Sequence, residues 1–439
     1  MHIMLQVRPI PEDIRDALGN GAAVADLATT TAIRSMPGIV LDDDYAPVAM
    51  THASIATIDD LSAMDAPTTA KFLVRGEISD NAVEVIGDRR IASRQAGAEI
   101  FADPSIEPLT SCMDEPAVGN WGDVASLLRT GDLSEQGCDG HLATIAVLDT
   151  GISREVVEAS LGREIKLDVE RSWAPSSVRQ NPGKHSATPH GSMCAFDALI
   201  AAPSANILDL PVLLSNRPGG SAIEGRLSDA VAAFAHLRTL LESMPEDKES
   251  LVVNNSWGVK SPSDDYAVGD PGNYTDNPSH PFNIAVSTLA KAGADILFAA
   301  GNCGQECPEC SFQQRPLVGA NSHPQVLTVG GVDISKRRVG YSTQGPGRLA
   351  DEKPDLCTYT HFAGSNCFMA DVGTSAACAV ASGVVAALRS SCPRRVASPG
   401  NMRATLRRTA EAISKYGFDY NYGYGVVDPI AALTMLLAH

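Results

Sequence analysis

Residues 143–152 read ATIAVLDTGI, an apolar run that ends in Asp149 and a Thr-Gly turn. A short apolar run closed by turn residues is typical of a strand that is buried on both faces. The backbone amides of such a turn can fix an aspartate just past the strand end, and the aspartate can then orient an imidazole. Many strands also end in aspartate for reasons of turn formation alone. The stretch therefore predicts a buried strand with a carboxylate at its carboxyl end.

The chain on both sides of this stretch alternates strand-like and helical patterns from Leu142 onward. The expected strands are 144–148, 206–212, 251–255, 296–300 and 326–330, and the expected helices are 191–200, 227–244, 281–292, 375–390 and 402–409. Such alternation implies a mostly parallel sheet between layers of helices, with the chemistry at the carboxyl ends of the strands. We therefore predict a three-layer α/β domain over residues 141–439.

Residues 1–115 have a different pattern and predict a small α+β domain. Strands are expected at 4–10, 71–78, 83–86 and 98–102, and a proline opens an expected helix at 11–18. Residues 116–140 are expected to be a connecting region with a helix near 124–128. The N-terminal domain is interpreted either as an inhibitory prosegment or as a permanent accessory domain.

Composition excludes several classes of protein. The formal net charge of −18 over 439 residues argues against a nucleic-acid partner bound through a basic face. No apolar run reaches 18 residues, so no membrane span is expected. The start of the chain lacks a basic segment followed by an apolar one. We therefore expect a cytoplasmic protein, or a secreted one if a leader was removed.

Three further polar residues lie at positions suited to acyl transfer. His190 precedes a glycine at a predicted helix start in TPHGSMCAFDALIAA, and Ser375 precedes a helix of small residues in DVGTSAACAVASGVVAALRS. Asn302 follows a buried strand in ILFAAGNCG. Free N–H groups at a helix start favour negative charge, and an asparagine amide can donate to an oxyanion. Each residue alone also has an ordinary explanation as a helix start, a helix cap or a turn residue.

Together these stretches resemble the subtilase family of serine proteases. ATIAVLDTGI, HGSMCA, VNNSWG, FAAGNCG and GTSAACAVASG follow the order of the blocks of that family, and KPDL (353–356) and GYGVVDPIAAL (423–433) are similar to it as well. The order Asp–His–Ser is that of the subtilisin triad. The resemblance covers about residues 142–433, and it implies a subtilisin-like fold and serine endopeptidase activity.

The resemblance also implies a role for each matching residue. Asp149 orients the imidazole, His190 is the general base and then acid, Ser375 is the nucleophile, and Asn302 is an oxyanion donor. Substrate backbone is implied to bind along Ser256, Trp257 and Gly258, and Ala299, Ala300 and Gly301 are implied to form a wall of the S1 pocket. The sequence departs from the family at Ala379, where a proline is usual, and at Trp257, where an aliphatic residue is more common. We expect the first change to have little effect on catalysis and the second to reshape the substrate subsites.

Three functions stay open at this point. The first is hydrolysis of internal peptide bonds in a peptide or protein substrate. The second is peptide maturation or macrocyclisation, in which an amine takes the acyl group from the same acyl-enzyme. The third is a non-catalytic binding module that keeps the fold, against which the complete set of catalytic residues argues.

No cofactor is expected for catalysis, and the cysteines raise the question of a structural metal. Of ten cysteines, Cys303, Cys307 and Cys310 are spaced C-x3-C-x2-C in one loop directly after Asn302. They could offer three thiolates to zinc, with Cys367 or another cysteine as the fourth ligand, or form a local disulfide. A structural zinc or calcium ion therefore stays open. Cys194, one helical turn after His190, is interpreted as a small buried residue.

Overall fold

The computed structural model of the chain describes residues 1–8, 38–50, 71–78, 98–108, 116–185, 187–214, 224–259, 261–307, 315–415 and 417–438. The expected helix at 11–18 and the expected strand at 83–86 lie outside these residues, as does Cys310. The described helices include none that is long and apolar enough to cross a membrane. Residues 1–108 are called the N-terminal unit below, and residues 116–438 the C-terminal unit.

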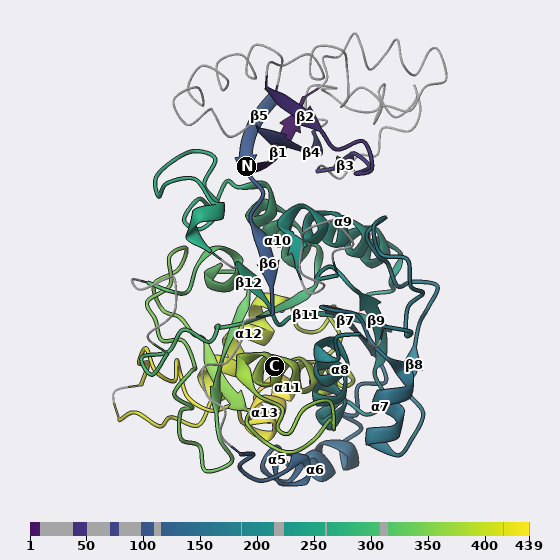
Figure 1. Cartoon of the computed structure of the whole chain (residues 1–439). Helices are drawn as coiled ribbons and strands as arrows, with labels where there is room; N and C mark the ends of the chain where they lie inside the picture. The colour runs from purple at the N-terminus through teal and green to yellow at the C-terminus, as the bar shows by residue number, and fades with distance from the viewer. Residues whose placement is uncertain are drawn as a thin grey trace.

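The C-terminal unit contains a seven-stranded sheet (Figure 1). Its strands are β7 (Ala143–Leu148), β8 (Lys166–Leu167), β9 (Asn206–Leu210), β11 (Ser250–Asn255), β13 (Asp295–Ala299), β14 (Leu327–Val332) and β15 (Leu356–Tyr359). All its pairings are parallel, and the order is β15-β14-β13-β11-β7-β9-β8. The strand order reverses beside β7, so β7 and β11 end at the point where ligands bind in open parallel sheets. The predicted α/β fold is thus confirmed, although β8 and β15 were not predicted.

Helices cover both faces of this sheet (Figure 1). The described α-helices of this unit are α5 (Trp121–Leu127), α6 (Thr130–Glu135), α7 (Arg154–Leu161), α8 (His190–Ala201), α9 (Leu227–Ser243), α10 (Pro281–Ala292), α11 (Gly373–Arg389), α12 (Pro399–Thr409) and α13 (Pro429–Leu437). Alternate residues of β7 face opposite cores. Ile145 and Val147 pack in one core with α8 and α11, while Ala146 and Leu148 pack in the other with α9 and α10. This burial on both faces explains why five of the six residues of the strand are apolar, with Thr144 as the exception.

The helices α8 and α11 touch through their backbones. A Cβ on Gly383 of α11 would lie 2.1 Å from the carbonyl oxygen of Ala198 in α8, which is far inside van der Waals contact. Only glycine permits this approach. The two helices that carry His190 and Ser375 are therefore held at a fixed, minimal separation.

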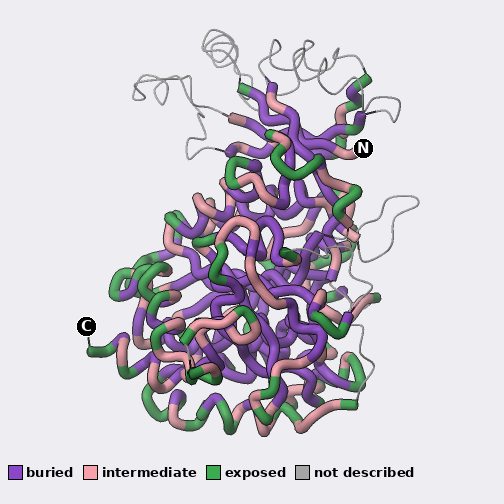
Figure 2. The backbone as a smooth tube through the Cα atoms, turned by 90° about the vertical axis from the view of Figure 1, so that its left-hand side faces the viewer, coloured by how far each residue is buried: buried purple, intermediate pink, exposed green. Residues whose placement is uncertain are grey.

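The N-terminal unit is an antiparallel sheet with the order β2-β4-β1-β5, and a short strand pairs with β4. Its strands are β1 (His2–Val7), β2 (Ile39–Leu41), β3 (Val48–Ala49), β4 (Phe72–Ile78) and β5 (Ala98–Ala102). Figure 2 shows that these strands are mostly buried and that the buried zone runs into the C-terminal unit. Met4, Leu73 and Phe101 accordingly belong to the same apolar cluster as α9 and α10.

One strand of the N-terminal unit enters the C-terminal unit. This strand, β6 (Ser105–Glu107), lies between β10 (Gly225–Arg226) and β12 (Gly258–Val259) and pairs antiparallel with both (Figure 1). Glu107 is paired with Gly258, and Ile106 with both Val259 and Gly225. A segment of the N-terminal unit therefore pairs at Gly258, along the stretch where the family resemblance implies that substrate backbone binds.

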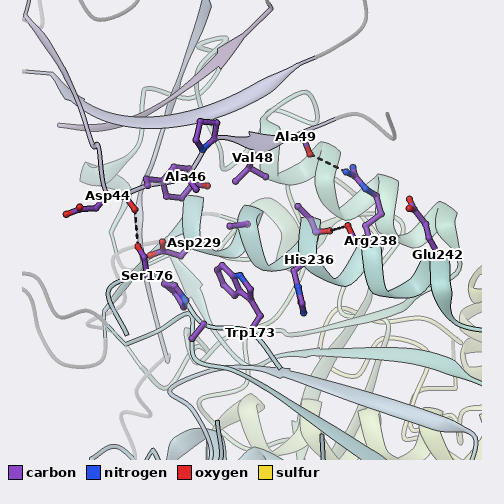
Figure 3. A pocket seen from close by; sticks show the side chains of 17 residues that line it. Asp44, Ala46, Val48, Ala49, Trp173, Ser176, Asp229, His236, Arg238 and Glu242 are labelled. Atoms are coloured by element: carbon purple, nitrogen blue, oxygen red, sulfur yellow. Dashed lines mark hydrogen bonds between the residues drawn. The ribbon is translucent and has the colours of Figure 1, made fainter. Parts of the chain in front are cut away.

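Polar contacts accompany the apolar contact between the units. Asp103 accepts hydrogen bonds from the backbone N–H (2.8 Å) and the hydroxyl (2.7 Å) of Ser228 in the first turn of α9. A cavity of about 540 Å³ lies beside this contact, between residues 44–49 and α9 (Figure 3). Its walls are bridged by hydrogen bonds from Ser176 to the Asp44 carbonyl (3.0 Å) and from Arg238 to the Ala49 carbonyl (3.2 Å). The cavity is away from the triad residues and forms part of the contact between the two units.

Residues 116–140, which we expected to connect two domains, are part of the C-terminal unit. They form α5 and α6, and Val124, Leu128 and Leu133 are buried in the core that contains α8 and α11. Asn120 begins α5 with a capping box that includes Asp123.

Candidate active site

Asp149 and His190 meet where β7 ends and α8 begins. The Asp149 N–H donates to the Leu210 carbonyl on the neighbouring strand (3.1 Å), and its Oδ1 accepts from the Thr150 N–H (2.7 Å). The same Oδ1 lies 2.7 Å from Nδ1 of His190. The Asp149 side chain is fully buried, whereas that of His190 is 16% exposed. A buried carboxylate on Nδ1 fixes the ring and leaves Nε2 for proton transfer.

A glycine at position 191 allows the start of α8 to approach the turn after Asp149. A Cβ on Gly191 would lie 2.5 Å from the Gly151 carbonyl oxygen. The Gly191 N–H donates to Thr150 Oγ1 (3.0 Å), and this hydroxyl donates to the Thr188 carbonyl (2.9 Å). The turn and the helix start are thereby linked, so the sequence HG places the imidazole against the carboxylate.

Ser375 is the third residue of α11 and is almost wholly buried. Two of the N–H groups that a helix start leaves without intrahelical partners are bound here by side chains: that of Gly373 donates to Tyr341 Oη (3.0 Å) and that of Thr374 to Asn302 Oδ1 (2.9 Å). The Ser375 N–H comes next in this first turn. Ser375 Oγ donates to the Ser256 carbonyl (3.2 Å), and among the described residues no hydrogen bond joins it to His190. Catalytic hydrogen bonds are often loose in unliganded proteins.

Asn302 lies directly beside the start of α11. Its Oδ1 accepts from both the backbone N–H (2.9 Å) and the hydroxyl (3.1 Å) of Thr374. These bonds fix which end of the amide faces the helix. A Cβ on Gly373, which has a φ of +82°, would lie 2.9 Å from Asn302 Nδ2. Glycine is required here both for its backbone conformation and for the room that it leaves to the amide.

Cys194 is buried, as predicted, and it touches the Asp149–His190 pair. Its Sγ lies 3.6 Å from Asp149 Oδ2 and 4.0 Å from His190 Nδ1. Burial, and then the charge of Asp149, raise the pKa of this thiol well above its usual value. The sulfur therefore stays protonated and serves as a weak donor to the carboxylate.

The strand that we expected to bind substrate is present, but its tryptophan does not line a cleft. Ser256 Oγ donates to the Ser375 carbonyl (3.1 Å), and Gly258 is paired with β6. The Trp257 side chain is wholly buried and packs against Phe282 and Phe298, with ring centroids 5.7 and 5.3 Å away. We expected Trp257 to reshape the subsites, and its buried position limits any such effect to support of the strand from beneath.

The segment expected as a pocket wall is braced by a residue that was not predicted. Ala299 and Ala300 are buried at the end of β13, and Gly301 donates its N–H to Thr374 Oγ1 (2.9 Å). Asn321 Nδ2 donates to the carbonyls of both Trp257 and Ala299, at 2.9 Å each. One amide thus ties the segment after β11 to the end of β13. Asn321 belongs to no motif, so this role could not be predicted from its position in the chain.

Two of the three cysteines after Asn302, Cys303 and Cys307, have the disulfide state, while Cys310 lies outside the described residues. Cys303 and Cys307 are both disulfide-bonded, so neither offers a thiolate to a metal in this structure. In the described part of the chain, the cluster of ligand-type side chains near enough to share an ion consists of Asp149, His190 and Cys194. These residues are the Asp149–His190 pair described above and the thiol beside it.

Comparisons with known proteins agree with this geometry. Residues 140–425 match the model of the Subtilase family, so the chain belongs to that family of serine proteases. It is 24% identical over 317 residues to a thermostable alkaline protease of Halalkalibacterium halodurans, covering 70% of this chain and 71% of that protein. It is 23% identical over 267 residues to proprotein convertase subtilisin/kexin type 7 of Mus musculus, covering 57% of this chain and 32% of that protein.

Proposed function

We propose that this protein is a serine endopeptidase that cleaves peptide bonds through an acyl-enzyme on Ser375. The observation that carries the proposal is the 2.7 Å contact between Asp149 and His190, in a site that also contains a serine at a helix start. His190 Nε2 takes the proton of Ser375 Oγ as this oxygen attacks the substrate carbonyl carbon, and Asp149 stabilises the imidazolium. The imidazolium then protonates the leaving amine, and water repeats the sequence to release the acyl group.

The developing oxyanion would be stabilised by two donors. Asn302 supplies its side-chain amide, whose oxygen is already held by Thr374, and Ser375 supplies its backbone N–H. Both donors are fixed before substrate arrives. They therefore need no reorganisation when the negative charge develops.

Substrate is proposed to bind as an added strand between β10 and β12, in the place that β6 takes in this structure. The pairing of β6 with both neighbours supports the proposal, because an extended segment already lies between them. Main-chain pairing of this kind gives affinity that depends little on sequence.

The N-terminal unit is proposed to be an inhibitory prosegment. Its β6 takes this place between β10 and β12, and its Asp103 binds the start of α9. A tethered strand inhibits well because its effective concentration is high. The cut that would release it is proposed to lie within residues 109–115, outside the described residues. N-terminal sequencing of the active protein would locate the cut, while an active, uncut chain would make the unit an accessory domain.

The test of the activity is Ser375→Ala. We expect this variant to fold, to lose labelling by a fluorophosphonate probe and to lose about 10⁴–10⁶ in kcat. Turnover like that of the wild type would refute the assignment. Mass spectra of the products separate hydrolysis from transfer to an amine, because the second joins the acyl fragment to the added amine.

A further inference from the structure

A second imidazole and carboxylate lie behind the catalytic aspartate. His185 Nε2 is 3.5 Å from Asp209 Oδ2, and the two side chains are 1% and 0% exposed. Both ring nitrogens of His185 and the Oδ1 of Asp209 lack a hydrogen-bond partner among the described residues. Buried polar atoms without partners cost free energy, so two such residues in contact call for an explanation. The proposed mechanism makes no use of either.

The His185 ring lies directly against the turn that carries Asp149. A Cβ on Gly151 would come within 2.4 Å of Cγ of His185, so ring and turn are in contact with no space between them. The His185 backbone N–H also donates to the Ile152 carbonyl (3.1 Å). Any displacement of the ring would therefore move the turn.

Asp209 holds the same turn from the neighbouring strand. It lies in β9 opposite Val147 of β7, next to Leu210, whose carbonyl accepts from the Asp149 N–H. Its Oδ2 accepts from the Gly183 N–H (2.8 Å), and the Ile152 N–H also stabilises its charged form. The carboxyl group thus connects β9 to Gly183, just before His185, and to Ile152, just after the turn.

The charge of this pair is set by its buried surroundings. Burial raises the pKa of Asp209 to about 7; the Gly183 and Ile152 amides oppose this rise, and the Asp149 charge adds to it. Burial lowers the pKa of His185. An isolated charge at either residue would be costly, whereas one proton held between the two residues leaves the pair neutral beside the Asp149 carboxylate.

We propose that His185 and Asp209 are a positioning pair: they hold the Asp149–Gly151 turn and so aim the Asp149 carboxylate at Nδ1 of His190. Neither residue touches substrate. The inference rests on the proposed function for its catalytic consequence, but the geometry that it concerns can be measured without turnover.

The test uses two variants and a matched control in the full chain. Asp209→Asn keeps the shape of the side chain and removes its titratable carboxyl group, while His185→Gln leaves every backbone donor of Asp209 in place. The control is Asp168→Asn, which breaks a partly exposed contact with Arg171. This contact lies in the loop whose Ser172 and Trp173 bind the Asp209 backbone, so the control disturbs the same surroundings without removing the Asp209 carboxyl. Like Asp209→Asn, it replaces a carboxyl group by an amide, but in the described part of the chain no hydrogen bond or ion pair joins Asp168 to the Asp149–Gly151 turn.

Three properties are measured for each protein: the pH profile of kcat/KM, the separate values of kcat and KM, and the downfield proton resonance of the His190 Nδ1–H, identified by its loss in His190→Ala. We expect Asp209→Asn and His185→Gln to lower kcat by about 10-fold to 10²-fold, since small misplacements of catalytic groups cost this much, with KM nearly unchanged. The resonance should shift and the pH profile should move in both variants. Asp168→Asn should behave like the wild type.

The proposal would be overturned by a wild-type resonance and pH profile in both variants, even if their melting temperatures fall, because the pair would then be structural only. If Asp209→Asn does not fold, His185→Gln decides the question alone. A wild-type chain that cleaves no peptide would refute the proposed function, and the resonance would still show whether the pair orients His190.

Discussion

Arg75 of the N-terminal unit offers the sharpest test of how that unit binds. Its Nε contacts Asp42 Oδ2 within the unit (2.8 Å), and its NH1 contacts Asp229 Oδ1 in α9 (2.8 Å) and Ser228 Oγ (3.3 Å). The guanidinium also lies 4.5 Å from the centre of the Tyr45 ring. The Arg75 side chain is only 6% exposed, so this is a buried ion pair across the contact.

The structure gives the size of the effect that Arg75→Ala should have. Removing one partner of a buried pair costs about 3–5 kcal/mol because the other charge stays buried and unpaired. In the variant complex Asp229 would lose this partner. At about 1.4 kcal/mol for each factor of ten, the inhibition constant should rise by about two to three and a half orders of magnitude.

The assay adds residues 1–115 as a separate segment to a protease made of residues 116–439 and measures the inhibition constant. The matched control is Arg8→Ala, because Arg8 pairs with Glu99 within the unit and both side chains are more than 40% exposed. A surface pair contributes about 0–1 kcal/mol, so the control should change the constant by less than about fivefold. Asp229→Asn in the protease should weaken inhibition by the wild-type segment in the same sense as Arg75→Ala.

An Arg75→Ala segment that inhibits as well as the Arg8→Ala segment would refute this reasoning. The affinity would then come from β6 and the apolar contact alone. A wild-type segment that does not inhibit, together with activity of the uncut chain, would instead remove the prosegment proposal as a whole.

Three further predictions concern the site and the contact. Asn302→Ala should lower kcat by about 10²–10³ with KM unchanged, as for a lost oxyanion donor; a rise in KM alone would make Asn302 a binding or turn residue. Burial lowers the pKa of His280 to about 3, so the unfolded chain takes up a proton below pH ~6.5 that the folded chain excludes. The free energy of unfolding should therefore fall from about pH 6.5 toward pH 3, by about 1.4 kcal/mol per pH unit for this residue. The measurement is chemical unfolding of Ser375→Ala at several pH values. When His280→Gln is added, the slope of the unfolding free energy against pH should decrease by the contribution of one proton. Reductant should lower the activity or the melting temperature through Cys303 and Cys307 while a chelator has no effect, and the reverse pattern would indicate zinc.

The elements that could be predicted from the sequence are those whose signals are local. β7 and β11 are apolar runs closed by polar residues, and α10 begins at a proline and ends before a glycine, so their positions follow from short-range rules. The start of α13 carried a readable signal as well, since Asp428 caps a helix that begins with Pro429. This helix was nevertheless not predicted. β8 has only two residues and is defined by its pairing with β9, which no local pattern shows.

The candidate catalytic residues could be proposed from the sequence because each lies in a motif, but the contacts that support them could not. Asn321 acts through two carbonyls that are 64 and 22 residues away in the chain. The direction of Trp257 was missed because it lies between β11 and β12, where the chain leaves regular strand pairing and the alternation of faces is interrupted. Such contacts depend on the packed structure, and one sequence does not report them.

The backbone contact between Gly383 and Ala198 has a consequence for how the protein responds to heat. Where two helix backbones are in direct contact, no layer of side chains can rearrange to let one helix slide along the other. The two helices therefore move together. The relative position of the imidazole and the serine then survives until the helix pair itself opens. Loss of turnover on heating should accordingly be abrupt and coincide with loss of tertiary structure, so that residual activity reports the fraction of molecules still folded.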